Sequence, residues 1–264
     1  MTIGIGALGS ESKNLPDTIV LIADTKGSFG GAYSMNRLHK LFYDKDAKVC
    51  ATAADGIDRA AELFTLIQQF LGKWNTGSYG NLLDSIHSAA EVYKRIKFKT
   101  EVLPRFAYLP NSIPEMFTEQ DLNPQLLRRW QRFYVGCEML VGAFDKDGQA
   151  YLFWLDGKGG VQNFSTPGFA AIGSGAENAM FWLSYRNHNK SYSPKRTAYH
   201  VFEAKIMSES SPFVNEKMDI LVARRDKWTF ISDSHPIPAD SPVTVEELRK
   251  LFDEEYGPKS TEAM

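Results

Sequence analysis

Thr2 is the residue of this sequence best suited to do chemistry with its own groups. It follows Met1 directly, in the opening segment 1–7 (MTIGIGA). Removal of Met1 leaves Thr2 with both a hydroxyl and a free α-amine, and such an amine can act as the general base that a weak alcohol needs. An unperturbed α-amine has a pKa of about 7.7–8.0, so part of it is neutral near physiological pH and can accept the hydroxyl proton. A threonine at position two also occurs by chance, so the hypothesis depends on residues further along the chain.

Two charged residues are placed to support such a nucleophile. Asp24 ends the apolar segment 18–23, and a hairpin between this segment and segment 2–8 would put Asp24 beside Thr2. Lys40 directly precedes another apolar segment. A nearby ammonium lowers the pKa of the amine, and a carboxylate keeps that ammonium charged and oriented. Each has a simpler interpretation as well, Asp24 as a strand-end turn residue and Lys40 as a surface lysine.

Two small-residue segments could complete a site. Backbone N–H groups of the turn 53–56 (AADG), that of Ala54 in particular, could form an oxyanion hole, worth about 3 kcal/mol per donor. Segment 173–175 (GSG) precedes a predicted helix, for which Ser174 is a capping candidate. The five histidines show no ligand-like spacing, so the sequence predicts neither a metal nor a cofactor.

Composition narrows the class of protein. The net charge of −2 gives no electrostatic argument for binding nucleic acid or an anionic membrane. The two cysteines, Cys50 and Cys137, lie far apart in apolar segments, which favours buried thiols in a reducing compartment. The N-terminus has no basic segment followed by an apolar one, and no apolar run approaches the roughly 20 residues that span a bilayer. We therefore expect a cytoplasmic protein with no membrane partner.

Hydrophobic periodicity predicts strands and paired helices in alternation. Strands are expected over 2–8, 18–23, 40–42, 48–54, 137–144, 150–155, 169–173, 217–223 and 228–231, and helices over 57–71, 82–96, 176–185, 194–207 and 245–252. This order favours an α+β fold with two sheets between helical layers. We expect one domain, 1–264, with a polar insertion at about 97–132 and a polar tail from about 236.

These segments, in their order and spacing, resemble the proteasome β-subunit family of N-terminal nucleophile (Ntn) hydrolases. The resemblance rests on segments 2–6, 22–28, 30–42, 53–58, 171–176 and 218–222. It implies a four-layer αββα sandwich of two antiparallel sheets between helix pairs. It also implies stacking into rings that enclose a proteolytic chamber.

The resemblance assigns a role to individual residues. Thr2 would be the nucleophile, its amine the general base, and Asp24 with Lys40 the supporting pair. The Ala54 N–H would be the oxyanion donor, and Ser174 would help to hold the amine and its water. Lys26 would be a supporting cation at a position where the family often has arginine.

The predicted function is a threonine-type endopeptidase that acts on polypeptides, with an ATP-dependent unfoldase left open as a partner. Two alternatives stay open. One is a catalytically silent ring-forming scaffold, because Ser211 and Val214 stand where the family has Asp and Ser. The other is an amidase of the same fold acting on a small amide, because the insertion at 97–132 could close the cleft.

Overall fold

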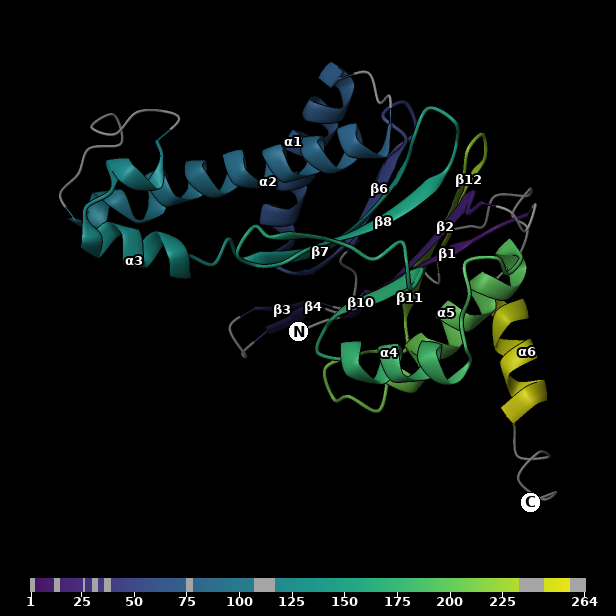
Figure 1. Ribbon diagram of the computed structural model, residues 1–264. Coiled ribbons are helices and arrows are strands. Elements are labelled where there is room, and N and C mark those ends of the chain that lie inside the picture. Colours follow the sequence, from purple (N-terminus) through teal and green to yellow (C-terminus); the bar gives the residue numbers. More distant parts are fainter. Residues whose placement is uncertain are drawn as a thin grey trace.

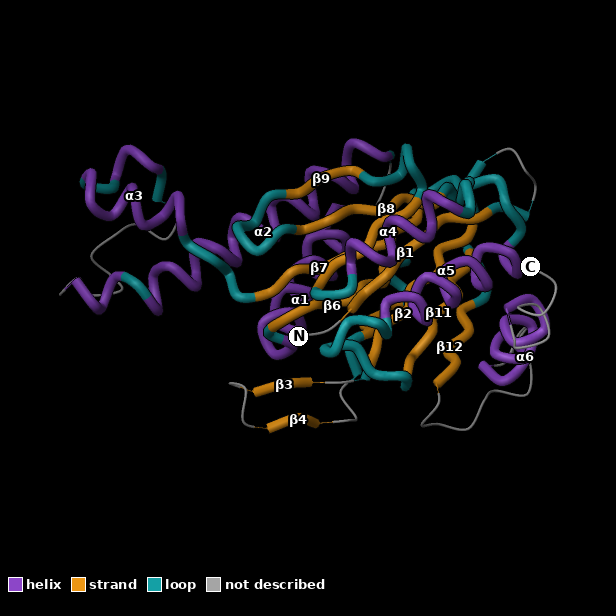
Figure 2. Tube along the Cα trace, turned by 90° about the horizontal axis from the view of Figure 1, so that it is seen from below, coloured by secondary structure: helices purple, strands orange, loops and turns teal. Residues whose placement is uncertain are grey.

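The computed structural model describes residues 3–11, 15–25, 27–29, 33–35, 39–74, 78–106, 117–232 and 245–256. Two of the predicted site residues, Thr2 and Lys26, lie outside these ranges. Figure 1 shows two sheets stacked face to face, with helices on the outer side of each. The view from below in Figure 2 shows the same layers with the strands running between the helices.

The first sheet contains the strand that leads away from position two. Its order is β10-β1-β2-β11-β12, with every neighbouring pair antiparallel. The strands are β1 (Ile3–Gly9), β2 (Thr18–Asp24), β10 (Phe169–Gly173), β11 (Met218–Arg224) and β12 (Trp228–Ser232). Both β1 and β2 are buried along their whole length, as expected for strands covered on both faces. Their pairing confirms the predicted first hairpin.

The second sheet has the order β5-β6-β7-β8-β9 and is also antiparallel. Its strands are β5 (Leu41–Asp44), β6 (Val49–Asp55), β7 (Cys137–Phe144), β8 (Ala150–Leu155) and β9 (Val161–Asn163). A separate ribbon pairs β3 (Gly27–Phe29) with β4 (Tyr33–Met35). The ribbon and β9 were not predicted from the sequence, because three-residue strands are too short to show a period.

Helices cover the outer face of each sheet. Helices α1 (Ile57–Trp74) and α2 (Tyr79–Glu101) pack on the second sheet, and α4 (Ala176–Tyr185) and α5 (Pro194–Ser208) on the first. A third apolar cluster fills the space between the sheets. Helix α6 (Val245–Tyr256) lies beside α5 and buries Leu248. The arrangement confirms the predicted four-layer αββα sandwich of the α+β class.

Glycines in β1 allow the two sheets to approach each other. Ile3, Ile5 and Ala7 belong to the cluster under α4 and α5, so the alternate residues face the second sheet. A Cβ at Gly4 would lie 2.8 Å from Thr52 Oγ1, and a Cβ at Gly6 would lie 3.1 Å from Leu152 Cδ1. A side chain at either position would therefore push the sheets apart.

The predicted insertion contains regular structure of its own. Helix α2 runs into it as far as Glu101, and η1 (Leu103–Phe106), η3 (Glu119–Asp121) and α3 (Pro124–Arg132) follow. We call residues 94–106 and 117–134 the arm. Its apolar side chains form a separate cluster of Phe98, Leu103, Phe117, Leu122, Leu126 and Trp130. In both views the arm extends beyond the sheets (Figures 1 and 2).

Local signals explain where α3 begins. The Asn123 carboxamide oxygen accepts hydrogen bonds from the backbone N–H groups of Gln125 and Leu126, and Pro124 occupies the first helical position. This capping pattern was readable in the sequence, but no helix was predicted within the polar insertion. Within the described ranges, none of the helices is long and apolar enough to cross a bilayer.

Candidate active site

The candidate site lies where β1 begins. Ile3, the first described residue, pairs with Gly173 of β10 on one side. On the other side its backbone N–H donates a 3.0 Å hydrogen bond to Asp24 Oδ1, at the end of β2. Thr2 precedes Ile3 in the sequence but falls outside the described residues. Ile3 is thus held between β2, which ends at Asp24, and β10, which Ser174 follows.

Asp24 and Lys40 form a buried ion pair. Lys40 Nζ lies 2.6 Å from Asp24 Oδ1, and the two side chains are 1% and 0% exposed. Burial lowers the pKa of Lys40 below its ordinary value, while attraction to Asp24 and the hydrogen bond to it act in the opposite direction. The structure brings these two predicted residues together, and neither simpler interpretation, a turn residue or a surface lysine, describes them.

A second carboxylate, that of Asp219, contacts His39, the residue before Lys40. Asp219 of β11 is buried and accepts a 2.6 Å hydrogen bond from Ser232 Oγ. His39 Nδ1 lies 3.0 Å from the other oxygen of Asp219, and the histidine ring is half exposed. Attraction to Asp219 also acts on the Lys40 ammonium. The sequence pointed to none of these contacts, although an aspartate inside the apolar run 218–223 was a usable signal.

Ser174 follows β10 and precedes α4. The N-cap position of α4 is Gly175, so Ser174 lies one residue before the cap. A Cβ on Gly175 would lie 2.9 Å from Ile3 Cδ1 and 3.1 Å from Val214 Cγ2. The Ser174–Gly175 segment therefore packs closely against the start of β1.

Ala54 lies near the end of β6 with its side chain in the cluster between the sheets. The preceding Ala53 N–H donates to the Lys40 carbonyl at 3.1 Å. Successive N–H groups of a strand point to opposite sides, so the Ala54 N–H points toward β7. Asp55 then takes a left-handed conformation (φ 64°) and accepts a hydrogen bond from the Tyr134 hydroxyl. The oxyanion role of Ala54 stays a prediction.

Thr52 is a polar residue of this region that the sequence did not single out. Its side chain is fully buried and faces Gly4 of β1. Within the described part of the chain, its hydroxyl has no hydrogen-bond partner. A buried hydroxyl without a partner costs free energy, and a catalytic role is one of the explanations for such a group.

Lys205 of α5 is a second buried lysine near the site. Its side chain is 0% exposed, and Nζ donates to the Asn215 carbonyl at 2.7 Å and to Glu209. Asn215 Nδ2 in turn lies 3.4 Å from the hydroxyl of Thr25, the residue after Asp24. Burial lowers the pKa of Lys205, against the attraction of Glu209 and Asp24. Lys205 thus connects α5, the loop 209–217 and the end of β2.

The arrangement provides a buried cation, a carboxylate and small-residue backbone around the start of β1. Such a set can hold an ammonium in place and stabilise negative charge that develops beside it. Among the described residues, no three His, Cys, Asp or Glu side chains lie close enough together to bind a metal ion.

Comparison with known proteins identifies a matching family model and similar folds. A model of the proteasome subunit family matches residues 118–207, about a third of the chain, starting inside the arm. No protein of curated function matches the sequence significantly.

Many solved structures have a similar fold, among them two of Anbu and one of HslV. Anbu (ancestral beta-subunit) from Yersinia bercovieri has a TM-score of 0.64 at 13% identity, covering 100% of this chain and 97% of that one. The Anbu (Gly-1) mutant from Hyphomicrobium sp. strain MC1 has a TM-score of 0.62 at 13% identity, with 98% and 97% covered. Eukaryotic HslV from Trypanosoma brucei has a TM-score of 0.55 at 18% identity, with 84% and 99% covered. At these identities the likeness concerns the fold.

Proposed function

We propose that this chain, whose fold is similar to those of HslV and Anbu, is a proteasome β-subunit-like threonine-type endopeptidase whose nucleophile is Thr2, exposed by removal of Met1. The observation that supports this most is the buried Asp24–Lys40 pair at the start of β1. Asp24 also accepts the backbone N–H of Ile3, the residue next to Thr2. The carboxylate therefore orients both the lysine and the strand that carries the nucleophile.

The proposed reaction uses the groups of the chain itself. The Thr2 hydroxyl attacks the peptide carbonyl and gives its proton to the Thr2 amine, which then passes a proton to the leaving amine. The Lys40 ammonium lowers the pKa of the Thr2 amine, so the amine is neutral and able to act as a base. Water then hydrolyses the acyl ester on Thr2 and restores the hydroxyl.

Supporting groups complete the proposal. The Ala54 N–H stays the proposed oxyanion donor, which requires it to turn from its β7 neighbour Glu138 toward the substrate, and Ser174 is proposed to hold the amine and its water. Lys26, outside the described residues, is a further supporting cation. Polypeptides are the proposed substrates, and copies of the chain are proposed to associate into rings, as the resemblance implies.

One experiment tests the nucleophile directly. Intact-mass measurement of the purified protein should show that Met1 is absent, and an electrophilic peptide should attach one label to Thr2. The matched control is Thr2→Ala, which keeps a small second residue and removes the hydroxyl. Met1 retained on all molecules, or equal labelling of Thr2→Ala, would contradict the proposal.

A silent scaffold is the second candidate, and one observation favours it. Val214 is buried against Gly175, so an apolar side chain occupies a place where the resemblance implies a polar one. A scaffold of this kind would assemble into rings, but the electrophilic peptide would not label it at Thr2. The small-amide alternative was motivated by closure of the cleft by the insertion, whereas the described part of the arm extends away from the sheets (Figure 1).

A further inference from the structure

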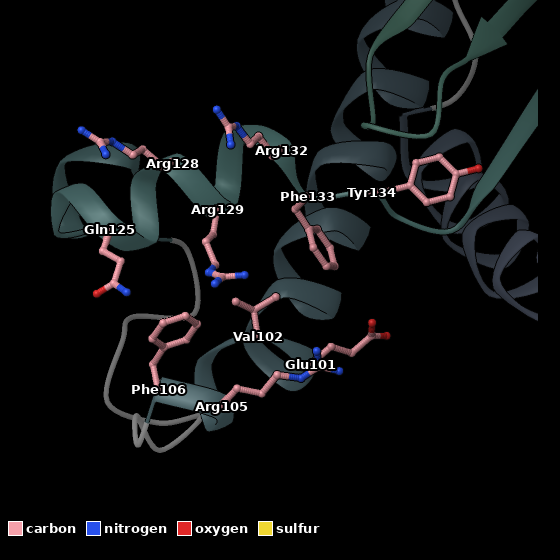
Figure 3. A pocket seen from close by; sticks show the side chains of 10 residues that line it. All are labelled: Glu101, Val102, Arg105, Phe106, Gln125, Arg128, Arg129, Arg132, Phe133 and Tyr134. Atoms are coloured by element: carbon pink, nitrogen blue, oxygen red, sulfur yellow. The ribbon is translucent and has the colours of Figure 1, made fainter.

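The arm carries an open pocket between α3 and the end of α2. Its volume is about 520 Å³, and its lining includes four arginines, Arg105, Arg128, Arg129 and Arg132, together with Phe106 and Phe133. Figure 3 shows Arg129 pointing from α3 into the space between the two walls, while Arg128 and Arg132 point outward from the same helix. The Arg129 guanidinium lies 5.0 Å from the Phe106 ring centre.

The positive charge of this pocket is not neutralised in the described part of the molecule. None of the four arginines forms an ion pair there. The one carboxylate that lines the pocket, Glu101, is paired with Arg59 at 3.1 Å. Arg129 and Arg105, beside the apolar side chains of Phe106 and Phe133, form a surface that favours carboxylates carried on a partly apolar body, and the outward Arg128 and Arg132 add positive charge at its edge.

Charge is distributed unevenly along the chain. Residues 94–134 contain eight Lys and Arg but only four Asp and Glu, although the whole chain has a net charge of −2. Helix α6 has the opposite character, with five Asp and Glu and two Lys and Arg. Of its acidic side chains, Glu246, Glu247 and Glu254 are exposed.

The basic and acidic elements lie at opposite ends of the molecule. Both views place α3 at one extreme and α6 at the other (Figures 1 and 2). Helix α6 is fixed to the body, because Leu248 is buried and Arg249 Nη2 donates to the Glu216 carbonyl at 3.1 Å. The arm pocket of one molecule therefore cannot receive its own α6.

We propose that the arm pocket binds the acidic face of α6 from a second copy of this chain. Complementary charges at opposite ends fix the direction of association, so each copy uses its arm toward one neighbour and its α6 toward the other. Such a head-to-tail contact builds closed rings or open helical assemblies. The inference rests on the proposed self-association, but it does not depend on Thr2 being a nucleophile.

Charge reversal on each side tests the contact in the full-length protein. The arm variant is Arg105→Glu with Arg129→Glu, and the α6 variant is Glu246→Lys with Glu254→Lys. Sedimentation velocity should show the wild type as assemblies larger than one chain. Each variant alone should associate at least tenfold more weakly, because like charges then face each other across the contact.

Mixing the two variants provides the decisive measurement. The glutamates of one variant then face the lysines of the other, so hetero-association should return toward the wild-type level. The control matched to the arm variant, Lys45→Glu with Lys146→Glu, lowers the net charge by the same amount at two exposed positions outside the arm and should assemble like the wild type. A monomeric wild type, unchanged assembly of the arm variant, or no recovery in the mixture would each overturn the proposal.

Cross-linking checks which surfaces meet. Arg129→Cys and Glu254→Cys chains, mixed and oxidised, should form a disulfide-linked dimer that neither forms alone, because the native thiols Cys50 and Cys137 are buried. Circular dichroism confirms that each variant is folded. Folded variants that assemble but give no linked dimer would show that another surface mediates the association. Labelling of Thr2 by an electrophilic peptide, measured on the same samples, separates this result from the test of catalysis.

Discussion

Lys40 Nζ lies 2.6 Å from Asp24 Oδ1 although neither side chain reaches solvent. Removing two charges from water is expensive, and the pair is tolerated only when its geometry and additional hydrogen bonds compensate. Asp24 Oδ1 also accepts the Ile3 N–H, so the pair is joined to the first described residue of β1. The ion pair thereby links β2, the start of β5 and the proposed nucleophile strand.

We expect Lys40→Met to destabilise the fold and abolish labelling at Thr2. It leaves the Asp24 carboxylate buried without its cation, which should lower the free energy of unfolding by about 3–5 kcal/mol. The double variant Asp24→Asn with Lys40→Met removes both charges and should recover much of the stability, but no labelling. Urea unfolding and labelling rates measure the two effects, with the exposed Lys45→Met as control. Labelling by the double variant at the wild-type rate would exclude a chemical role for the pair.

The rate of labelling should depend on pH in a bell-shaped manner. It should rise as the Thr2 amine loses its proton and fall as Lys40 loses its own. Because burial lowers the pKa of Lys40, the alkaline limb should lie below the ordinary lysine value of 10.5. Lys40→Arg should move that limb to higher pH, since a guanidinium stays protonated. An alkaline limb that is the same in both proteins would assign it to another group.

The positions of Asp24 and Lys40 were predictable from the sequence, because each lies directly at one end of an apolar strand segment. Asp24 ends a continuous apolar strand, and the antiparallel hairpin of β1 and β2 then places it opposite Ile3. Lys40 precedes β5 directly. Local patterns were sufficient for both positions, and the resemblance supplied their pairing.

The other contacts could not be predicted, because their partners are far apart in the sequence. Asp219 meets His39 from 180 residues away, and Asn215 meets Thr25 from 190 residues away. The side chain of Lys205 gave no indication of burial, since lysines on helices are normally exposed. Helix α3 was missed because its apolar residues serve the small cluster of the arm and do not extend the main cores.

Lys205→Met should weaken the site without unfolding the protein. The change removes the donor to the Asn215 carbonyl, so the far part of the loop 209–217 loses this hydrogen bond to α5. Glu209, the other partner, is partly exposed and remains solvated, so the loss of stability should be about 1–3 kcal/mol, less than for Lys40→Met.

Labelling at Thr2 should slow by roughly tenfold in Lys205→Met, because a displaced loop reduces the fixed geometry at the end of β2. The control Lys195→Met changes an exposed lysine of the same helix. Labelling rates together with thermal unfolding measure both effects. If Lys205→Met labels as fast as Lys195→Met, the loop does not position the site.

Stability should decrease in acid through His188. Burial lowers the pKa of His188 to about 4. Nε2–H of the neutral ring donates to the Leu8 carbonyl of β1 at 3.1 Å, and Nδ1 faces His200 Nδ1 at 3.3 Å, so protonation places two N–H groups against each other. Between pH 6.5 and 4 the unfolded chain binds the proton and the folded chain does not. The stabilisation is therefore complete above pH 6.5 and is lost as the pH falls toward 4, by about 3 kcal/mol.

His188→Gln provides the test of this loss, because its amide can still donate to the Leu8 carbonyl but does not titrate. Urea unfolding at pH 7, 5.5 and 4 should show a smaller decrease for His188→Gln than for the wild type. The exposed His87→Gln is the matched control and should lose stability as the wild type does, because it leaves the contact between His188 and β1 intact. If His188→Gln and His87→Gln lose stability in parallel, the acid sensitivity originates elsewhere, and the contact between His188 and β1 does not control it.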